Sequence, residues 1–136
     1  ASGPCDAPGG CTDSAKTYPW GEESPTCSLA HMMASTKGCD TGQTASVESY
    51  PDGQSTEGVI NLAGNAWEWV DDAWHAGYEG HPTDGSAWSE TATSLRVVRG
   101  GGLGSLADTL RSAHRWNAGP QDLSPDYGFR CCRDAQ

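Results

Sequence analysis

Apolar residues occur along this chain in short runs that turn-forming residues interrupt. The clearest strand pattern is SLRVVRGG (94–101), which a run of three glycines ends. GVINLAG (58–64) and AWEWV (66–70) each indicate a short strand or a turn-flanked segment. LRSAHRW (110–116) places alternate residues on one face and predicts a second strand, and YGFRCCRD (127–134) predicts a terminal strand.

Helical signals are weak by comparison. SLAHMMAS (28–35) predicts one short helix, with Ser28 as its N-cap. The chain of 136 residues has 18 glycines and 8 prolines, which favours turns and long loops over a helical bundle. We therefore expect one α+β domain, loop-rich with short strands and little helix, over residues 18–136. Residues 1–17 are small and polar and predict an irregular N-terminal arm held by disulfides.

Charge narrows the range of partners. The 18 acidic residues outnumber the 8 basic ones, and the net charge is −10. Such a surface repels phosphate backbones, so we expect no nucleic-acid partner. No apolar run approaches the ~20 residues that a membrane span needs, so we expect no span.

Six cysteines in a small acidic chain indicate disulfides in an oxidising compartment. Zinc is the competing interpretation, but no CxxC pair occurs. We expect a secreted protein, extracellular or periplasmic.

One ten-residue stretch, NLAGNAWEWV (61–70), is rich in polar and aromatic residues. An amide and a carboxylate stand close to two glycines and two tryptophans. Calcium takes about 6–8 oxygen ligands from carboxamides, carboxylates and backbone carbonyls, and this stretch supplies all three kinds. From the residues alone, a buried hairpin with a satisfied polar turn is the preferred interpretation.

Five motifs that follow one another along the chain favour a calcium site over this hairpin. They are YPWG (18–21), GVINLAGNAWEWV (58–70), RVVRGG (96–101), LRSAHR (110–115) and YGFR (127–130). In order and spacing they resemble the formylglycine-generating enzyme family, also called the sulfatase-modifying factor domain. The resemblance spans roughly residues 18 to 130 and implies a fold related to C-type lectins. YPWG lies in the middle of the family's domain, so the family's N-terminal portion is absent from this sequence.

The resemblance implies a calcium ion, Ca2+, in the motif at 58–70. Its ligands would be the Asn61 side chain, the carbonyls of Gly64 and Ala66, and the Glu68 carboxylate. A second calcium site of the family is expected to be lost, because His31 replaces a ligand asparagine and imidazole suits calcium poorly. Asp40 would match another ligand of that site.

The resemblance also bears on the cysteines. Cys27 and Cys39 flank the loop of the second site, and we expect them to form a disulfide that replaces that ion. Cys5 and Cys11 would then pair with Cys131 and Cys132, because a bridge between neighbouring cysteines would strain a small ring. Which arm cysteine joins which strand cysteine stays open.

Catalysis is not expected. The family's enzymes use two cysteines after RGG to bind copper, and GGGLGSLADTLRSAHR (100–115) contains none. Ser105 stands near the position of the first, and serine cannot bind copper(I) as a thiolate does. Ser105, His114 and Asp108 lack the nucleophile-elbow context of a hydrolase triad. His75 and His81 flank a tyrosine-containing loop without forming a metal motif.

Two functions remain. The first is a secreted, calcium-stabilised, disulfide-bonded, lectin-like binding module with an unknown protein or glycan ligand. The alternative is a fragment or pseudo-enzyme relative of a formylglycine-generating oxidase that needs a missing N-terminal portion or a partner. The chain also resembles the variable proteins of diversity-generating retroelements, which display ligand-binding residues after RGG. Here those positions would be Leu103, Gly104, Ser105, Leu106, His114, Trp116, Asn117 and Ala118.

Overall fold

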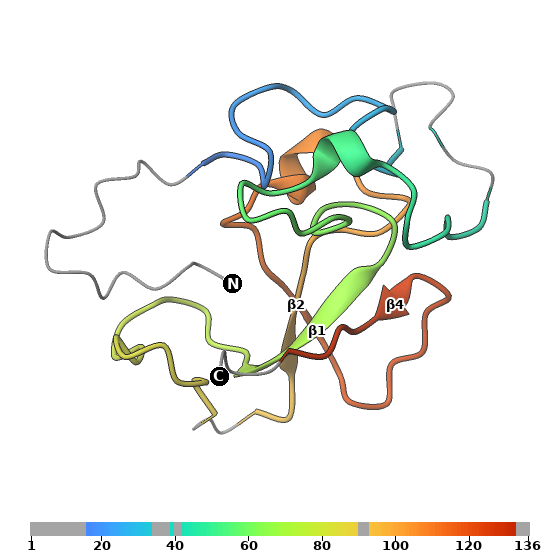
Figure 1. Cartoon of the computed structure of the whole chain (residues 1–136). Helices are drawn as coiled ribbons and strands as arrows, with labels where there is room; N and C mark the ends of the chain where they lie inside the picture. Colours follow the sequence, from blue (N-terminus) through green and yellow to red (C-terminus); the bar gives the residue numbers. More distant parts are fainter. Residues whose placement is uncertain (1–15, 34–38, 40–41, 90–92, 133–136) are drawn as a thin grey trace, which may run out of the picture.

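The computed structural model describes residues 16–33, 39, 42–89 and 93–132. These residues form a small curled sheet below a mass of loops that carries two short 3-10 helices (Figure 1). The helices are η1 (Pro51–Gly53) and η2 (Ala107–Leu110). No helix in the described residues is long and apolar enough to cross a bilayer.

Four strands make the sheet, in the order β3-β2-β1-β4. β1 (Trp67–Ala73) and β2 (Arg96–Arg99) pair antiparallel, with Glu68 opposite Arg99. β3 (Trp116–Ala118) pairs antiparallel with the other edge of β2. β4 (Tyr127–Gly128) pairs parallel with β1, so Gly128 lies beside Glu68. The C-terminal motif thereby returns to the start of the strand that carries the predicted calcium ligand.

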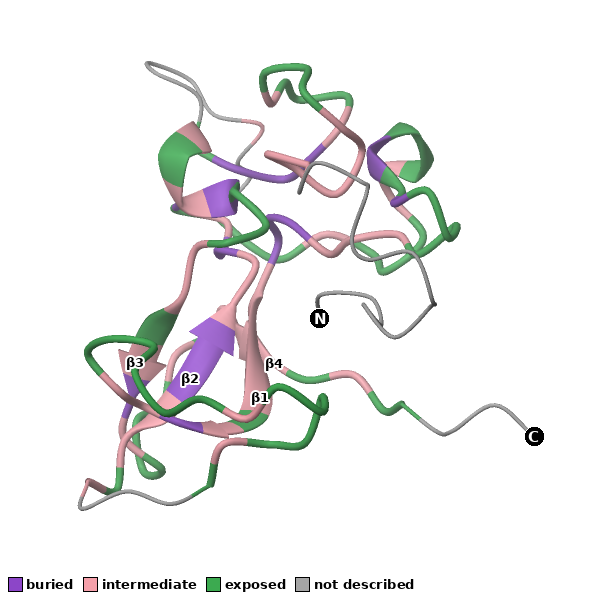
Figure 2. Ribbon diagram, turned by 90° about the vertical axis from the view of Figure 1, so that its left-hand side faces the viewer, coloured by how far each residue is buried: buried purple, intermediate pink, exposed green. Residues whose placement is uncertain are grey.

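The interior is thin, and small residues fill much of it. Val97 and Val98 are buried at the centre of the sheet, as Figure 2 shows for β2. A second cluster under the loops contains Ala30, Met32, Ala63 and Leu110, with Tyr18 and Trp20 packed against it. A core of this size needs support from loop hydrogen bonds and a crosslink.

The strand predictions for 66–70 and 94–101 are confirmed by β1 and β2. The glycine run ends β2 as expected: Gly100 and Gly101 have φ of 88° and 80°. A side chain at Gly100 would also press on the carbonyl oxygen of Leu62.

Two other element predictions are wrong within the described residues. Residues 28–33 form no helix, because Ala30, His31 and Met32 are all buried in succession, whereas a helix would turn one of them outward. LRSAHRW begins with the end of η2 and a turn, and the strand starts only at Trp116. For residues 58–64 the structure has the turn-flanked segment, not the strand: a turn precedes it and residues 62–64 are bends.

The disulfide between Cys27 and Cys39 is present, with a Cα–Cα distance of 5.2 Å. The predicted bridges from Cys131 and Cys132 are not made: both thiols are free and exposed. The physical reason is that β4 ends at Gly128, so no strand holds these two residues against the fold. Cys5 and Cys11 lie outside the described residues, as does Asp40.

Candidate metal-binding pocket

A tightly coiled loop leads into β1 and forms the candidate site. Asn61, Gly64 and Asn65 all have positive φ, at 55°, 79° and 67°. This left-handed backbone suits asparagine and glycine. There is a second reason for glycine at position 64: a Cβ there would overlap the backbone of His31. Three left-handed residues in five wind the chain so that it closes around a small volume.

Asn65 fixes the coil to a distant segment. Its side-chain oxygen accepts a hydrogen bond from the backbone N–H of Ala45 at 2.7 Å, and its amide donates to the Ala45 carbonyl at 3.2 Å. Its own backbone N–H donates to the His31 carbonyl at 2.8 Å. The sequence analysis missed this role, although an asparagine between a glycine and an alanine is a signal for a left-handed position.

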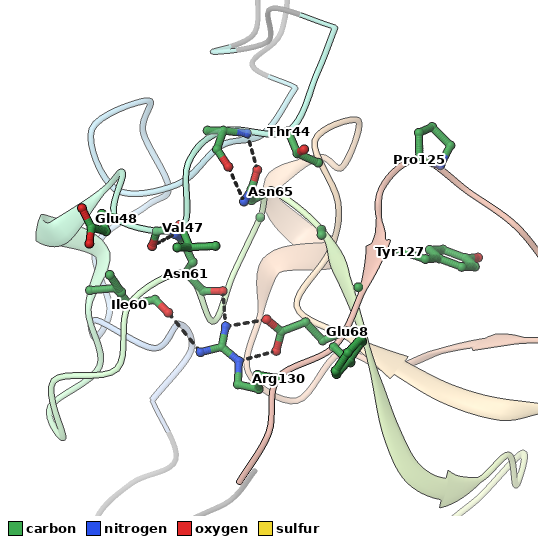
Figure 3. Close-up of a pocket in the computed structure, with 15 residues that line it drawn as sticks. Thr44, Val47, Glu48, Ile60, Asn61, Asn65, Glu68, Pro125, Tyr127 and Arg130 are labelled. Carbon is green, nitrogen blue, oxygen red and sulfur yellow. Dashed lines mark hydrogen bonds and ion pairs between the residues drawn. The ribbon is translucent and has the colours of Figure 1, made fainter.

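The coil opens onto a cavity of about 520 Å³. All four predicted calcium ligands line it, together with Glu48 and residues of the β4 segment. Figure 3 shows Asn61 and Glu68 on facing sides of this space, with Arg130 between them. The sequence prediction therefore selected residues that the fold brings together.

Arg130 is the residue that the sequence analysis did not place in the site. Its Nε donates to one carboxylate oxygen of Glu68 at 2.7 Å, and a terminal nitrogen contacts the other oxygen. The same guanidinium donates to the carbonyls of Ile60 at 3.2 Å and Asn61 at 2.8 Å. The hydrogen bond that Arg130 donates to Glu68 raises the pKa of Arg130 and outweighs the opposing effect of burial. YGFR was recognised as a motif, but nothing local in a sequence pairs residues 62 positions apart.

The donor set fits a hard cation. The Asn61 amide donates to the Val47 carbonyl at 2.6 Å, which leaves its side-chain oxygen Oδ1 buried with no hydrogen-bond partner. A buried oxygen without a partner is costly, and a cation would satisfy it. The described residues contain no group of three His, Cys, Asp or Glu side chains suited to a metal. Any metal here must therefore rely on amide and backbone oxygens, which calcium accepts and softer metals do not.

The Arg130–Glu68 pair sets a limit on this fit. A carboxylate has about four lone-pair positions, so Glu68 can accept from Arg130 and still face an ion. The guanidinium charge would nevertheless oppose a cation at close range. A bound ion therefore requires Arg130 to move from its position between Asn61 and Glu68 to the far side of the carboxylate.

The predicted ligand-binding positions after RGG divide into two groups. Trp116, Leu106 and Gly104 are exposed, and Trp116 retains 55% of its surface. Leu103, His114 and Asn117 are partly buried. Ser105 and Ala118 are buried, so they do not share this surface. The Ser105 hydroxyl accepts a hydrogen bond from the Gly102 N–H at 2.9 Å, which makes it a structural turn residue.

His114 lies beneath this surface, with its ring 5.9 Å from that of Trp67. Its Nε2 is buried without a hydrogen-bond partner. Burial lowers the pKa of His114, and repulsion from Arg111 and Arg99 lowers it further, against a weaker attraction to Asp108.

His31 is buried as well. Both of its ring nitrogens lack partners, and the ring stacks on Tyr50 with centroids 5.8 Å apart. The imidazole is therefore packed into the interior of the fold. The expectation that the second calcium site is lost stays a prediction, since Asp40 lies outside the described residues.

Comparison with known protein families gives one match over nearly the whole chain. A model described as the sulfatase-modifying factor enzyme 1-like domain matches residues 5–135. The serine/threonine-protein kinase Pkn1 of Chlamydia trachomatis serovar L2 is 37% identical over 122 residues. The formylglycine-generating enzyme of Thermomonospora curvata is 35% identical over 136 residues. These matches take in 88% and 86% of this chain but only 18% and 43% of those proteins.

Solved structures agree on the fold. PvdO from Pseudomonas aeruginosa superimposes with a TM-score of 0.69 and 35% identity, over 85% of this chain and 42% of that one. Treponema denticola variable protein 1 superimposes with a TM-score of 0.61 and 26% identity, over 75% of this chain and 34% of that one. The predicted fold class, α+β and formylglycine-generating-enzyme-like or C-type-lectin-like, is confirmed by these neighbours and by the small sheet.

Arg130→Lys should destabilise the fold by about 1–2 kcal/mol, because a single ammonium cannot replace a guanidinium that contacts one carboxylate and two carbonyls at once. Thermal melts in the presence of chelator measure the loss without any contribution from metal. Arg111→Lys is the matched control, since Arg111 is exposed and makes one side-chain hydrogen bond, to Asp108. Equal melting temperatures for Arg130→Lys and the control would contradict the role given to Arg130.

His114 should make the fold less stable in acid. Because its pKa is lowered on folding from the ordinary 6.5, the unfolded chain takes up a proton first as the pH falls. This contribution is fully present above pH 6.5 and is lost as the pH drops through 6.5 toward the lowered folded value. Urea melts at pH 8 and pH 5 should therefore differ less for His114→Asn than for the wild type. The exposed His81→Asn is the control, and an unchanged difference in His114→Asn would refute the assignment.

Proposed function

Because this chain belongs to the sulfatase-modifying factor enzyme 1-like domain family, we propose that it is a secreted, calcium-stabilised, lectin-like binding module without catalytic cysteines. The observation that carries the calcium assignment is the buried, unpartnered Oδ1 of Asn61 in a cavity that the other three predicted ligands also line. In this arrangement the ion would hold the coil of residues 61–66 against the start of β1. Its chemistry is structural: it neutralises Glu68 and orients the oxygens around it.

The binding role is supported by the surface after RGG. Trp116 and Leu106 keep about half of their area exposed, at 55% and 53%, and the other five tryptophans are each partly buried. Exposed tryptophans are enriched at interfaces because they give large contact area with little loss of conformational entropy. Treponema denticola variable protein 1 has the same fold. The ligand would be a protein or a glycan and, given the net charge of −10, not a nucleic acid.

Secretion is supported by the crosslink. The disulfide between Cys27 and Cys39 persists in oxidising compartments and is rare in reducing ones. It closes a sequence separation of 12 residues beside the core cluster, and such a loop contributes on the order of 2–3 kcal/mol in the chain-entropy model.

The second candidate is a piece of, or a pseudo-enzyme related to, a larger catalytic chain. The curated relatives include formylglycine-generating enzymes and hercynine oxygenases, and this chain spans less than half of each reported relative. The segment 100–115 lacks cysteine, so this chain would contribute scaffold rather than copper ligands. The first candidate is a binding module without catalysis, whereas the second is a piece or a relative of a catalytic chain.

Calcium should raise the melting temperature of the wild type relative to a chelator, because a ligand that binds only the folded state stabilises it by linkage. At 100 times the dissociation constant the gain is about 2.7 kcal/mol, or several degrees for a domain of this size. Glu68→Gln should shrink the difference between calcium and chelator. Glu23→Gln removes an equal charge from an exposed position away from the cavity and should leave the difference intact.

Wild-type melts that coincide in calcium and chelator would exclude the calcium assignment. Arg130→Lys separates the two roles of Glu68: it removes the two-point guanidinium contact but keeps the carboxylate, so the calcium-dependent difference should survive in that variant.

A formylglycine assay separates the two candidate functions. A cysteine-containing sulfatase peptide, incubated with the protein, copper, reductant and oxygen, should remain unmodified by mass spectrometry. A formylglycine-generating enzyme run in parallel confirms that the conditions support turnover. Conversion above a no-protein control would reject the non-catalytic module in favour of an enzyme.

A further inference from the structure

A second cluster of aromatic and polar side chains lies at the other end of β1, in the loop of residues 74–88. Trp74 begins this loop directly after the strand, and Trp88 closes it. In Figure 1 the loop extends from the lower end of β1, away from β4. Trp74 follows Glu68 by six positions along β1. At 3.3 Å per residue, this places the two residues about 20 Å apart. The cluster is thus separate from the calcium cavity.

Aromatic rings in this loop stack instead of packing into a core. The His75 and Trp88 rings are parallel, with centroids 3.5 Å apart and an interplanar angle of 2°. The Arg115 guanidinium lies over the rings of Trp74 at 4.7 Å and Tyr78 at 4.1 Å. Tyr78 remains 54% exposed. A structural cluster would bury these rings, whereas this one presents them at the surface.

The loop is fixed before any ligand arrives. Arg115 donates to the carbonyls of His75 at 2.7 Å and Gly77 at 3.0 Å. The Trp88 backbone donates to the Asp72 carboxylate at 2.8 Å and accepts from the Ala73 N–H at 2.9 Å. A platform held in this way loses little conformational entropy on binding.

An open pocket lies against these rings, lined by Trp74, His75, Ala76, Gly77, Glu79 and Trp88. Polar groups accompany the rings at this pocket. Nε2 of His75 is buried with no hydrogen-bond partner, and Glu79 is exposed. Aromatic rings beside a few polar groups are a usual composition of a small-ligand site.

The charges of the pocket restrict the ligand. Arg115 already stacks on Trp74 and Tyr78, so a cationic ligand would meet a fixed positive charge where aromatic rings could otherwise hold it. An anionic ligand would meet Glu79 and a chain of net charge −10. A neutral ligand with one apolar face and several hydroxyls satisfies both the rings and the polar groups.

We propose that the 74–88 loop is a binding site for a neutral carbohydrate. The apolar face of a sugar ring would lie on the indole surface, and its hydroxyls would hydrogen-bond to the exposed Glu79 carboxylate. The inference names a ligand class and a location for the proposed binding module and rests on that function. The location differs from the surface around Trp116.

The test is a titration of the whole protein with neutral oligosaccharides of two to six units: cello-, chito-, malto- and manno-oligosaccharides. Tryptophan fluorescence and calorimetry report binding. At least one series should bind the wild type. Trp88→Ala and Glu79→Ala should each weaken it by about tenfold or more, the factor expected for losing the platform or one charge-assisted hydrogen bond. Leu123→Ala, which removes an exposed apolar side chain outside both pockets, is the control and should bind as the wild type does.

Three results would overturn the proposal. The first is no binding by a wild type whose melting curve shows it to be folded. The second is loss of binding in Trp116→Ala with no loss in Trp88→Ala, and the third is a preference for charged oligomers, of uronic acids or of amino sugars without N-acetyl groups, over neutral ones. Melting temperatures of every variant establish that it is folded. The calcium assignment is tested by melts and this site by titration, so either can fail without the other. Repeating the titration in chelator keeps the two separate.

Discussion

The Arg130–Glu68 pair is the contact on which the rest of this architecture depends. The domain has a small core, a four-stranded sheet and long loops, so few elements hold one another in place. One guanidinium joins the C-terminal segment to the start of β1 and to the loop carbonyls of Ile60 and Asn61. The side chains of Arg130 and Glu68 are 32% and 21% exposed, which places the pair between a screened surface bridge and a costly buried one.

This pair also determines what the neighbouring cavity can hold. By occupying the Glu68 carboxylate, Arg130 fixes the carboxylate near Asn61, whose Oδ1 has no partner. A cation entering the cavity would complete the oxygen set, against repulsion from the guanidinium that shares the carboxylate. The left-handed coil at Asn61, Gly64 and Asn65 is then stabilised from both sides, by the ion within and by Ala45 outside. Crosslinking at Cys27–Cys39 supplies the remaining constraint on the loops.

Local sequence patterns were sufficient for part of this picture. They located β1, β2 and the glycine turn after β2, because strand alternation and left-handed turns depend on neighbouring residues. The four residues that line the cavity were named from the family resemblance, not from local patterns. Local patterns failed where long-range contacts determine the structure. The run Ala30–Met32 is helical in local preference but irregular in the fold, since three successive residues are buried. Arg130 and Arg115 act on residues 62 and 40 positions away, and no periodicity reports such distances. Cys131 and Cys132 were assigned to a strand that ends at Gly128.

The most direct test of this account is a high-resolution crystal structure of the protein grown in calcium. The account predicts a single strong density peak in the cavity, 2.3–2.6 Å from Asn61 Oδ1, from the carbonyl oxygens of Gly64 and Ala66, and from a carboxylate oxygen of Glu68. Arg130 should have moved from between Asn61 and Glu68 to the opposite side of that carboxylate. Density for water alone beside Asn61 Oδ1, with the Arg130 guanidinium still bound to Glu68 and to the Asn61 carbonyl, would contradict the account.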